Sequence, residues 1–427
     1  MERSKKVIYL LIYWYIYSGL LKYIGIDSKL IDYVPDLFAI YLGFLFIRKQ
    51  TDVKISSLVG RPILLLSFFF ILTGFISGFI NQANPISVLW GSHFYFCYLF
   101  LLMAMHKSFE PEDVLKLRKI LIQGLVVNMI AVLIEVIVFE IEGDPLGGTF
   151  WGNSFGYTFM VPCLFLLAAE YYHDGVTKEL FFFCIAVMVF FAIAGGVKIV
   201  YFTLPIIIYS IYVFQKDFSY RHIIILIIGF FLIIPVYQYF MQYWYEKEYV
   251  EKVFTTEYVE EETSNKGFGG EFNRSTSIEK SMVYLLKDPV SMVIGHGFGA
   301  SSTSSLFISD FAQKHQHLVY QYFSPSYLLA EVGWIGFLLF LLIHVFLLLF
   351  FYRWYREYKD DDVMRYWSSI GVCSVLMQFL FTWYNNHPVI NNYPMVILWG
   401  MIFVAIKYRL IEIEEGQEES ELIQFEE

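Results

Sequence analysis

The sequence predicts an all-α polytopic membrane protein with about 12 transmembrane helices and one large loop on the outer face. Of its 427 residues, 57% are hydrophobic and only 16% are charged, whereas a soluble domain carries about a quarter charged residues. The apolar residues also come in long runs. A run of about 18 apolar residues can span a bilayer as a helix, because a helix satisfies its backbone hydrogen bonds internally. A third observation, the distribution of lysine and arginine, orients these helices.

The apolar runs define the predicted spans and divide the chain into four parts. In chain order the spans are 7–24, 33–47, 63–80, 88–105, 120–139, 155–169, 180–197, 199–214, 223–240, 327–351, 367–384 and 393–406. Nine spans fill residues 1–240, a large extracytoplasmic loop occupies 241–318, three spans fill 319–409, and an acidic cytoplasmic tail follows at 410–427.

Basic residues place both termini on the cytoplasmic side, because cytoplasmic loops are enriched in lysine and arginine. With the N-terminus inside, 20 of the 30 basic residues fall in the inner segments. The short outer connections keep only Lys22, Lys29 and Lys198. The remaining seven lie in the 241–318 loop, which is too long for charge to govern its side.

Composition also excludes several classes of function. The formal net charge of −10 is concentrated at 246–262 and 412–427, which makes a nucleic-acid partner a poor fit. The four cysteines fall inside apolar runs and have neither disulfide nor zinc spacing. The outer loop shows no cluster of carboxylates, so we expect no metal and no cofactor. The apolar stretch that begins at Val7 is too long for a cleavable signal peptide.

Three charged residues lie where a charge is costly or faces the outer compartment. Lys198, between two apolar runs, is either an anion clamp or an interface lysine with its charge in water. Arg274 precedes a predicted helix whose N-terminus would favour an anion; the alternative is a solvated arginine. Glu135 lies within the fifth span, where a carboxylate suggests function, or else is protonated or paired in the bundle.

The large loop contains one predicted amphipathic helix. Thr276 and Glu279 have the spacing of a capping box, and apolar residues follow at helical spacing until Asp288 and Pro289 stop the helix. We expect this helix to lie over the outer mouth of the bundle.

Polar residues with ligand-binding potential gather in the outer turns. His315 and His317 end the large loop, where a histidine can accept a hydroxyl proton or simply be solvated. Gly297 and Gly299 belong to a Gly-His-Gly-Phe-Gly run that allows close backbone approach, or forms an ordinary turn. Asn153 ends a Gly- and aromatic-rich turn. Another turn holds Asn385, Asn386, His387, Asn391 and Asn392. Such amides and aromatics suit hydroxyl-rich ligands and ordinary turns alike.

The order of these features resembles the O-antigen polymerase and O-antigen ligase family of lipid-linked glycan transferases. The resemblance covers residues 147 to 336 and is most specific at 295–299 and in the stretch Ser-Tyr-Leu-Leu-Ala-Glu-Val-Gly-Trp-Ile-Gly at 326–336. Two positions depart from the family pattern. Lys198 stands where the family usually has arginine, and Phe323-Ser324-Pro325 stands where it usually has His-Asn.

The resemblance implies an inverting, metal-independent glycosyltransferase of the bacterial cytoplasmic membrane. Its donor would be a glycan on undecaprenyl pyrophosphate, and its acceptor the terminal hydroxyl of another lipid-linked repeat unit. The product would be a surface polysaccharide such as O-antigen, capsule or exopolysaccharide. A chain-length regulator and a flippase would be its protein partners. The alternatives are a ligase that moves a finished glycan to an anchor, and a flippase or transporter of lipid-linked glycans.

The same resemblance assigns roles to the candidate residues. Lys198 and Arg274 would meet the charge of the departing pyrophosphate. His317 is the first choice for the base and His315 the second, with Glu331 and Glu135 as carboxylate alternatives. Residues expected to contact the glycan are Asn153, Gly297, Gly299 and Glu135.

Overall fold

The structure, a computed structural model, describes residues 2–26, 29–48, 61–215, 272–303 and 308–426. In these residues the chain is helical, and its β-structure is a single bridge between Thr303 and Ile308. Six of the described helices are long and apolar enough to cross a membrane. The protein is therefore an all-α, membrane-embedded chain.

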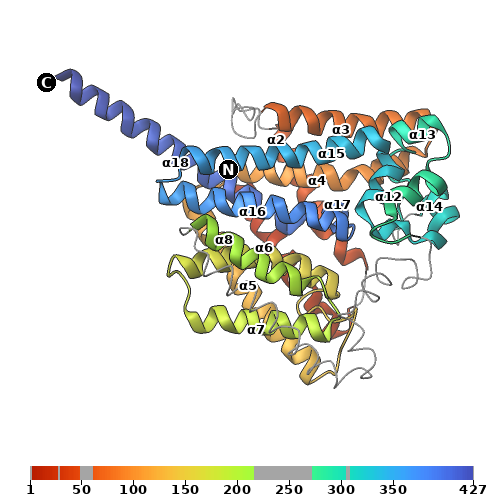
Figure 1. The fold of residues 1–427 in the computed structure, drawn as a ribbon, viewed down its shortest axis with the longest axis horizontal. Helices are drawn as coiled ribbons and strands as arrows, with labels where there is room; N and C mark the ends of the chain where they lie inside the picture. The colour runs from red at the N-terminus through yellow and green to blue at the C-terminus, as the bar shows by residue number, and fades with distance from the viewer. Residues whose placement is uncertain (1, 27–28, 49–60, 216–271, 304–307, 427) are drawn as a thin grey trace.

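Long helices account for most of the described chain (Figure 1). They are α1 (Glu2–Tyr17), α2 (Val34–Arg48), α3 (Arg61–Ile80), α4 (Pro85–Ser108), α5 (Pro111–Ile137), α6 (Asn153–Tyr172), α7 (Lys178–Ala194), α8 (Val200–Gln215), α15 (Ser324–Glu357), α16 (Asp362–Tyr384) and α18 (Tyr393–Glu426). The 310 turn η1 (Ser18–Ile24) continues α1, and η2 (Lys29–Tyr33) precedes α2. Each predicted span falls on one of these elements, except 223–240, which lies outside the described residues together with 241–271 of the large loop.

Several helix starts follow from local sequence. Asn84 accepts a hydrogen bond from the Ile86 amide and is followed by Pro85, which starts α4. Glu110 and Asp113 form a capping box around Pro111 at the start of α5. These polar and proline residues separate apolar runs that would otherwise read as continuous.

Ion pairs join helices at one end of the bundle. The pairs are Lys5–Glu110 at 2.6 Å, Arg118–Glu170 at 2.6 Å and Arg409–Asp361 at 2.7 Å. All six residues lie in segments that the sequence predicts at the cytoplasmic side. The pairing therefore agrees with helices that alternate in direction, while the orientation of this end in a membrane stays a prediction.

Short helices gather at the opposite end, which we call the loop end. They are α12 (Ser277–Lys280), its π-helical continuation η4 (Ser281–Leu285), α13 (Pro289–Ile294), α14 (Asp310–His315), the 310 turns η5 (Gln316–Leu318) and η6 (Tyr320–Tyr322), and α17 (His387–Ile390). Figure 1 shows α12, α13 and α14 together at the end of the bundle that is remote from the projecting part of α18.

The predicted loop helix exists, but its cap differs from the prediction. The helix runs from Ser277 to Leu285 through α12 and η4. The Thr276 side chain makes no capping bond; instead, the Asn273 side-chain oxygen accepts from the Thr276 amide at 2.8 Å. Asp288 starts the next helix, α13, by capping the amides of Val290 and Ser291.

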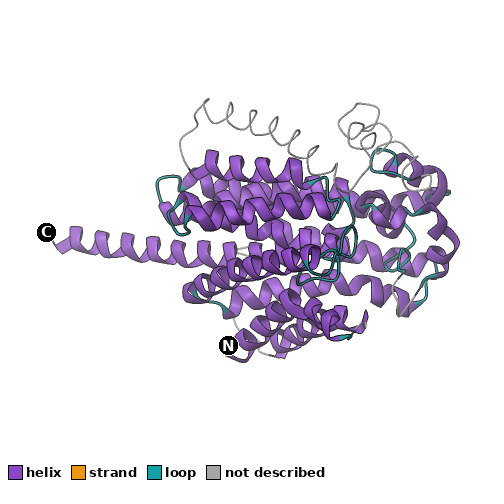
Figure 2. Cartoon of the chain, turned by 90° about the horizontal axis from the view of Figure 1, so that it is seen from below, coloured by secondary structure: helices purple, strands orange, loops and turns teal. Residues whose placement is uncertain are grey.

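The C-terminal acidic segment is helical. Helix α18 continues without a break from the bundle to Glu426, so it includes nearly all of the predicted tail at 410–427. Figure 2 shows this part as a single helix that extends away from the other helices.

Candidate functional site

Lys198 and Asn153 lie in adjoining turns. Lys198 follows α7, and Asn153 begins α6. The Asn153 side-chain amide donates to the Gly195 carbonyl oxygen at 2.7 Å and to the Asp144 carboxylate at 3.2 Å. Asn153 therefore holds together the two turns that precede α6 and α8, and thereby positions the backbone near Lys198.

Contacts at the far end of α8 show which end of the bundle these turns occupy. The Gln215 side chain, at the end of α8, donates to the Ser369 hydroxyl at 2.5 Å, near the start of α16. Helix α16 starts at the ion-paired end, beside Asp361, so the start of α8 lies about 24 Å away, toward the loop end. Lys198 is half-buried there.

Glu135 is a fully buried carboxylate with hydrogen bonds to both of its oxygens. One oxygen accepts from the Lys22 ammonium at 2.6 Å. The other accepts from the Gly147 amide at 3.0 Å and also from the Gly148 amide. These contacts support the alternative that Glu135 is a paired group that holds the 147–153 turn on α5.

Arg274 is fixed against the last residue of α16. Its Nε donates to the Tyr384 carbonyl oxygen at 3.1 Å, and its guanidinium carbon lies 4.4 Å from the centroid of the Tyr384 ring. This arrangement uses one edge of the guanidinium for the backbone and one face for the ring. Arg274 is thus anchored at the loop end of α16.

A path of contacts connects the Lys198 turn with Arg274. Phe155, two residues after Asn153, meets the His387 ring with centroids 5.7 Å apart. His387 begins α17, three residues after Tyr384. Burial lowers the pKa of His387 to about 4, so its imidazole is neutral near pH 7. The sequence indicated this polar turn but gave no specific role to His387, because its partner Phe155 is distant in the chain.

His315 has the geometry of an oriented imidazole. Its Nδ1 lies 2.9 Å from the Phe311 carbonyl oxygen, and its ring lies 4.4 Å from the Phe311 ring. A contact with a carbonyl needs the proton on Nδ1, which leaves Nε2 as the acceptor of the neutral ring. Burial lowers the pKa of His315, and the nearby charges of Lys314 and Lys287 lower it further, although the bond to Phe311 opposes them.

His317 has a different environment. It lies in η5 with an exposed side chain. The sequence ranked His317 ahead of His315 as the base. Of the two, His315 is the one that combines partial burial with an orienting hydrogen bond, which favours the reverse order.

Gly297 and Gly299 pack directly against backbone. A Cβ on Gly297 would lie 2.5 Å from the Gly78 Cα in α3, and one on Gly299 would lie 2.0 Å from the Ser87 carbonyl oxygen in α4. Both residues also have positive φ, 101° and 78°. Their glycine identity is thus explained by close packing of the 295–299 turn between helices.

The same turn completes a break in α15. Gly333, with φ 60° and ψ −164°, interrupts this helix. The amides of His296 and Gly297 then donate to the Ala330 and Glu331 carbonyl oxygens, each at 2.8 Å. These carbonyls would otherwise lose their helical donors at the break. The sequence motif therefore joins the loop end to the membrane-embedded part of α15.

Glu331 forms the centre of a buried polar cluster. Its Oε1 accepts from the Gly299 amide at 3.0 Å and from the Ser301 amide at 3.4 Å. Its Oε2 is buried and has no hydrogen-bond partner among the described residues, and the same holds for the hydroxyls of Tyr95, Ser301 and Tyr320. Buried polar atoms in native proteins usually have a hydrogen-bond partner, and those without a protein partner are commonly bonded to ordered water. The cluster lies beneath the loop end. From the sequence, Glu331 was predicted only as an alternative base.

Among the described residues, no group of three or more His, Cys, Asp or Glu side chains is arranged to hold a metal ion. Comparison of the chain with protein-family models and with curated proteins finds no match. The functional argument therefore depends on the residues themselves.

Proposed function

We propose that this protein is a glycosyltransferase that polymerises undecaprenyl-pyrophosphate-linked oligosaccharides on the outer face of the bacterial cytoplasmic membrane. The observation that carries the proposal is the placement of Lys198 and Arg274 in contact-linked segments at the loop end of a membrane-embedded bundle. A lipid-linked pyrophosphate lies at the membrane surface, so cations held there by a helical frame suit it.

The proposed reaction transfers a glycan between two lipid-linked molecules. A hydroxyl of the acceptor attacks C1 of the donor sugar and forms the new glycosidic bond with inversion. The bond between C1 and the pyrophosphate oxygen breaks, and pyrophosphate leaves on the lipid with the electron pair. Lys198 and Arg274 stabilise the charge that develops on this leaving group.

A base must accept the proton of the attacking hydroxyl. We assign this role to Nε2 of His315, whose Nδ1 contact with the Phe311 carbonyl oxygen orients the ring. The lowered pKa keeps the imidazole neutral near pH 7. His317 remains the alternative, because its exposed position allows it to reach a substrate above the loop end.

The other predicted glycan contacts have mainly positioning roles in this proposal. The Asn153 amide is bonded to Gly195 and Asp144, Glu135 is paired, and Gly297 and Gly299 pack against helices. Two exposed aromatic residues at the loop end, Tyr322 and Trp383, offer rings for a sugar to pack on.

The decisive experiment is to delete the gene and to size the lipid-linked glycans that accumulate. Single repeat units that face outward are expected if the protein is the polymerase. Long lipid-linked chains without anchored product would identify a ligase, and units that face the cytoplasm would identify a flippase. Purified protein in proteoliposomes, supplied with lipid-linked units alone, should then make polymer.

A further inference from the structure

Glu331 is a buried carboxylate that has no counter-charge among the described residues. Three glutamates are buried in this part of the chain, and two of them form ion pairs. Glu135 pairs with Lys22, and Glu170 pairs with Arg118. Glu331 is 0% exposed and takes part in none of the ion pairs found among the described residues. An uncompensated buried charge is costly, so such a group must gain either a proton or a cation.

The hydrogen bonds to Glu331 favour its charged form. Its Oε1 accepts from the Gly299 amide at 3.0 Å and from the Ser301 amide at 3.4 Å. Donors to a carboxylate oxygen stabilise the anion relative to the neutral acid. The backbone at 299–301 therefore presents two donors to an anion, while Oε2 has no partner.

The hydroxyls of Ser301 and Tyr320 lie near this carboxylate. Ser301 is the residue whose amide bonds to Oε1. Burial raises the pKa of the Tyr320 phenol, the nearby Ser301 side chain opposes this rise, and the charge of Glu331 adds to it. Both hydroxyl oxygens are buried and have no hydrogen-bond partner among the described residues. Two oxygen atoms thus remain available beside the carboxylate.

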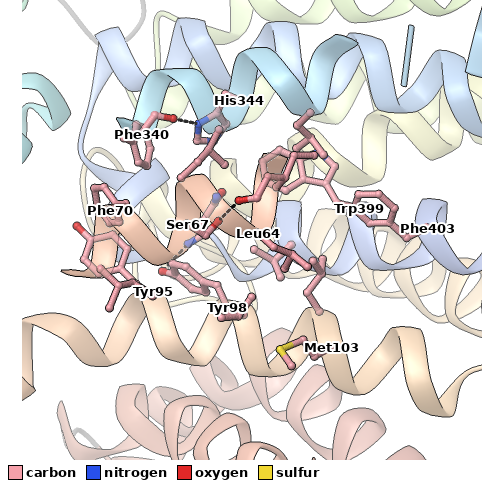
Figure 3. Close-up of a pocket in the computed structure, with 18 of the residues that line it drawn as sticks. Leu64, Ser67, Phe70, Tyr95, Tyr98, Met103, Phe340, His344, Trp399 and Phe403 are labelled. Atoms are coloured by element: carbon pink, nitrogen blue, oxygen red, sulfur yellow. Dashed lines mark hydrogen bonds between the residues drawn. The ribbon is translucent and has the colours of Figure 1, made fainter. Parts of the chain in front are cut away.

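Tyr95 approaches the same place from α4. Its ring centroid lies 5.0 Å from that of Phe298, which precedes Gly299. A Cβ on Gly91, one helical turn before Tyr95, would overlap the Gly299 amide nitrogen, so this face of α4 contacts the turn. Figure 3 shows Tyr95 beside Phe70 at one end of an apolar cavity of about 170 Å³. None of the residues that line this cavity is Asp, Glu, Lys or Arg, so this side supplies no counter-charge.

A bound cation satisfies these groups together. A proton on Oε2 neutralises the charge but bonds to only one of the three hydroxyl oxygens. A water molecule bonds to several oxygens but leaves the charge uncompensated. A small hard cation takes several oxygen ligands and also supplies the missing positive charge. The break in α15 at Gly333, two residues after Glu331, adds a feature that is common beside ion sites in membrane proteins.

We propose that Glu331, together with the hydroxyls of Ser301, Tyr320 and Tyr95, binds a monovalent alkali cation. A single carboxylate matches a single positive charge, and the other ligands are neutral oxygen atoms. Divalent ions are usually held by more than one acidic group, and no set of three or more acidic, His or Cys side chains gathers in the part of the chain that the structure describes.

The cation has a structural role in this arrangement, because it fastens the 299–301 backbone to α15. That backbone in turn holds the start of α14. The Ser309 amide donates to the Ser302 carbonyl oxygen at 3.1 Å, and the Ser309 hydroxyl donates to the Ala300 carbonyl oxygen. The same hydroxyl caps α14 by accepting from the Ala312 amide at 2.9 Å. The site therefore stabilises the segment that ends at His315, whatever reaction the protein catalyses.

The test uses the purified full chain in detergent at mildly alkaline pH, where protons compete weakly. Choline chloride replaces the alkali salts, and NaCl or KCl is then titrated in at constant ionic strength. Binding of radioactive sodium and the apparent melting temperature are the two measurements. We expect saturable binding of one ion per chain and a rise in melting temperature of about 2–5 °C as the site fills.

Glu331→Gln removes the charge but keeps the size of the side chain and an acceptor for the two amides. It should abolish both cation binding and the thermal shift. Glu279→Gln is the matched control, because Glu279 is exposed in α12 and should affect neither measurement.

Ser301→Ala and Tyr320→Phe each remove one hydroxyl oxygen. Each should weaken cation binding about tenfold, because a contact to a charged group contributes at least this much. Tyr322→Phe is the control, since Tyr322 lies in the same 310 turn as Tyr320 but is 61% exposed. These two variants keep the test decisive if Glu331→Gln does not fold.

Three outcomes would overturn the inference: equal stabilisation by choline and by both alkali cations, no binding of either alkali cation at millimolar concentration, or unchanged binding in the folded variants of Glu331, Ser301 and Tyr320. Stability that responds to no cation would show that Glu331 holds a proton and that water fills the space around it. The measurements use no glycan substrate, so they neither depend on the proposed function nor test it.

Discussion

The guanidinium of Arg274 lies 4.4 Å from the centroid of the Tyr384 ring, and its Nε donates to the Tyr384 carbonyl oxygen at 3.1 Å. The two residues are 110 positions apart, so this contact joins the beginning of the described loop to the end of α16. An arginine that is held in this way keeps its charge at a defined place on the bundle.

Arg274→Ala should reduce the initial rate of polymer formation by about 10²–10³-fold, the usual effect of losing one donor to a developing anion. The rate of Arg274→Lys should fall between those of the wild type and of Arg274→Ala, because lysine keeps the charge but cannot reproduce the planar contact. The measurement is polymer formation in proteoliposomes at matched protein level. Arg353→Ala is the control, since Arg353 is exposed and paired with Glu357. A normal rate for Arg274→Ala would remove this residue from the site.

Lys198→Ala should also lower the rate strongly, by the same electrostatic argument. Lys198→Arg should keep much of the activity, because a guanidinium retains the charge and adds a bidentate donor. Lys178→Ala, at the opposite end of α7, serves as the control. If Lys198→Ala and Lys178→Ala give equal rates, the lysine between α7 and α8 is an interface residue rather than an anion clamp.

The helices were predictable because each apolar run is local in the sequence. The run at 63–80, for example, coincides closely with α3 (Arg61–Ile80). The partners of buried polar groups were not predictable, because they depend on contacts between distant segments. Lys22 and Glu135 are 113 positions apart, and nothing in either neighbourhood identifies the other. The contact that favours His315 over His317 as the proposed base likewise involves the Phe311 carbonyl, whose direction only the folded loop fixes.

The predicted orientation can be tested by labelling single cysteines with an impermeant reagent in intact cells. Two serines in segments that the sequence predicts on opposite sides, Ser302 in the large loop and Ser57 between the second and third spans, are poor sites, because Ser302 is only 7% exposed and Ser57 lies outside the described residues. Gln313 in α14 and Asp360 after α15 are both exposed and lie at opposite ends of the bundle. We expect Gln313→Cys to be labelled and Asp360→Cys to be protected until the cells are permeabilised.

The four native cysteines are buried, so they should give little background. The opposite pattern, with Asp360→Cys labelled in intact cells and Gln313→Cys protected, would invert the topology. It would also place the proposed site on the cytoplasmic side.

Glu135→Ala should destabilise the fold by about 3–5 kcal/mol, because it leaves the Lys22 ammonium without its counter-charge and two backbone amides without their acceptor. Thermal unfolding in detergent measures the effect, and Glu142→Ala, at an exposed position nearby, is the control. Removing both charges in Lys22→Ala/Glu135→Ala should recover part of the loss. A stable but inactive Glu135→Ala protein would instead support a direct role in catalysis.

Alanine variants of His315 and His317 distinguish between these two candidates for the base. His315→Ala should lose about 10²–10⁴-fold in rate, the usual contribution of a general base. His317→Ala should lose much less, since its ring is exposed and η5 shows no orienting bond for it among the described residues. Initial rates at saturating substrate, with matched protein level, measure the difference. Equal losses in the two variants would contradict this assignment.

The pH dependence of the rate also tests the assignment of His315 as the base, because nearby positive charges affect the pKa of its imidazole. A base must be unprotonated, and burial with the adjacent lysines lowers the pKa of His315. Activity should therefore persist as pH falls through the ordinary histidine range and decline only below it. Lys314→Ala removes a positive charge that opposes protonation, so it should move the acidic limb to higher pH. Gln313→Ala, the neighbouring uncharged control, should leave the limb in place. An acidic limb that is the same in all three proteins would show that the group titrating in the rate is not His315.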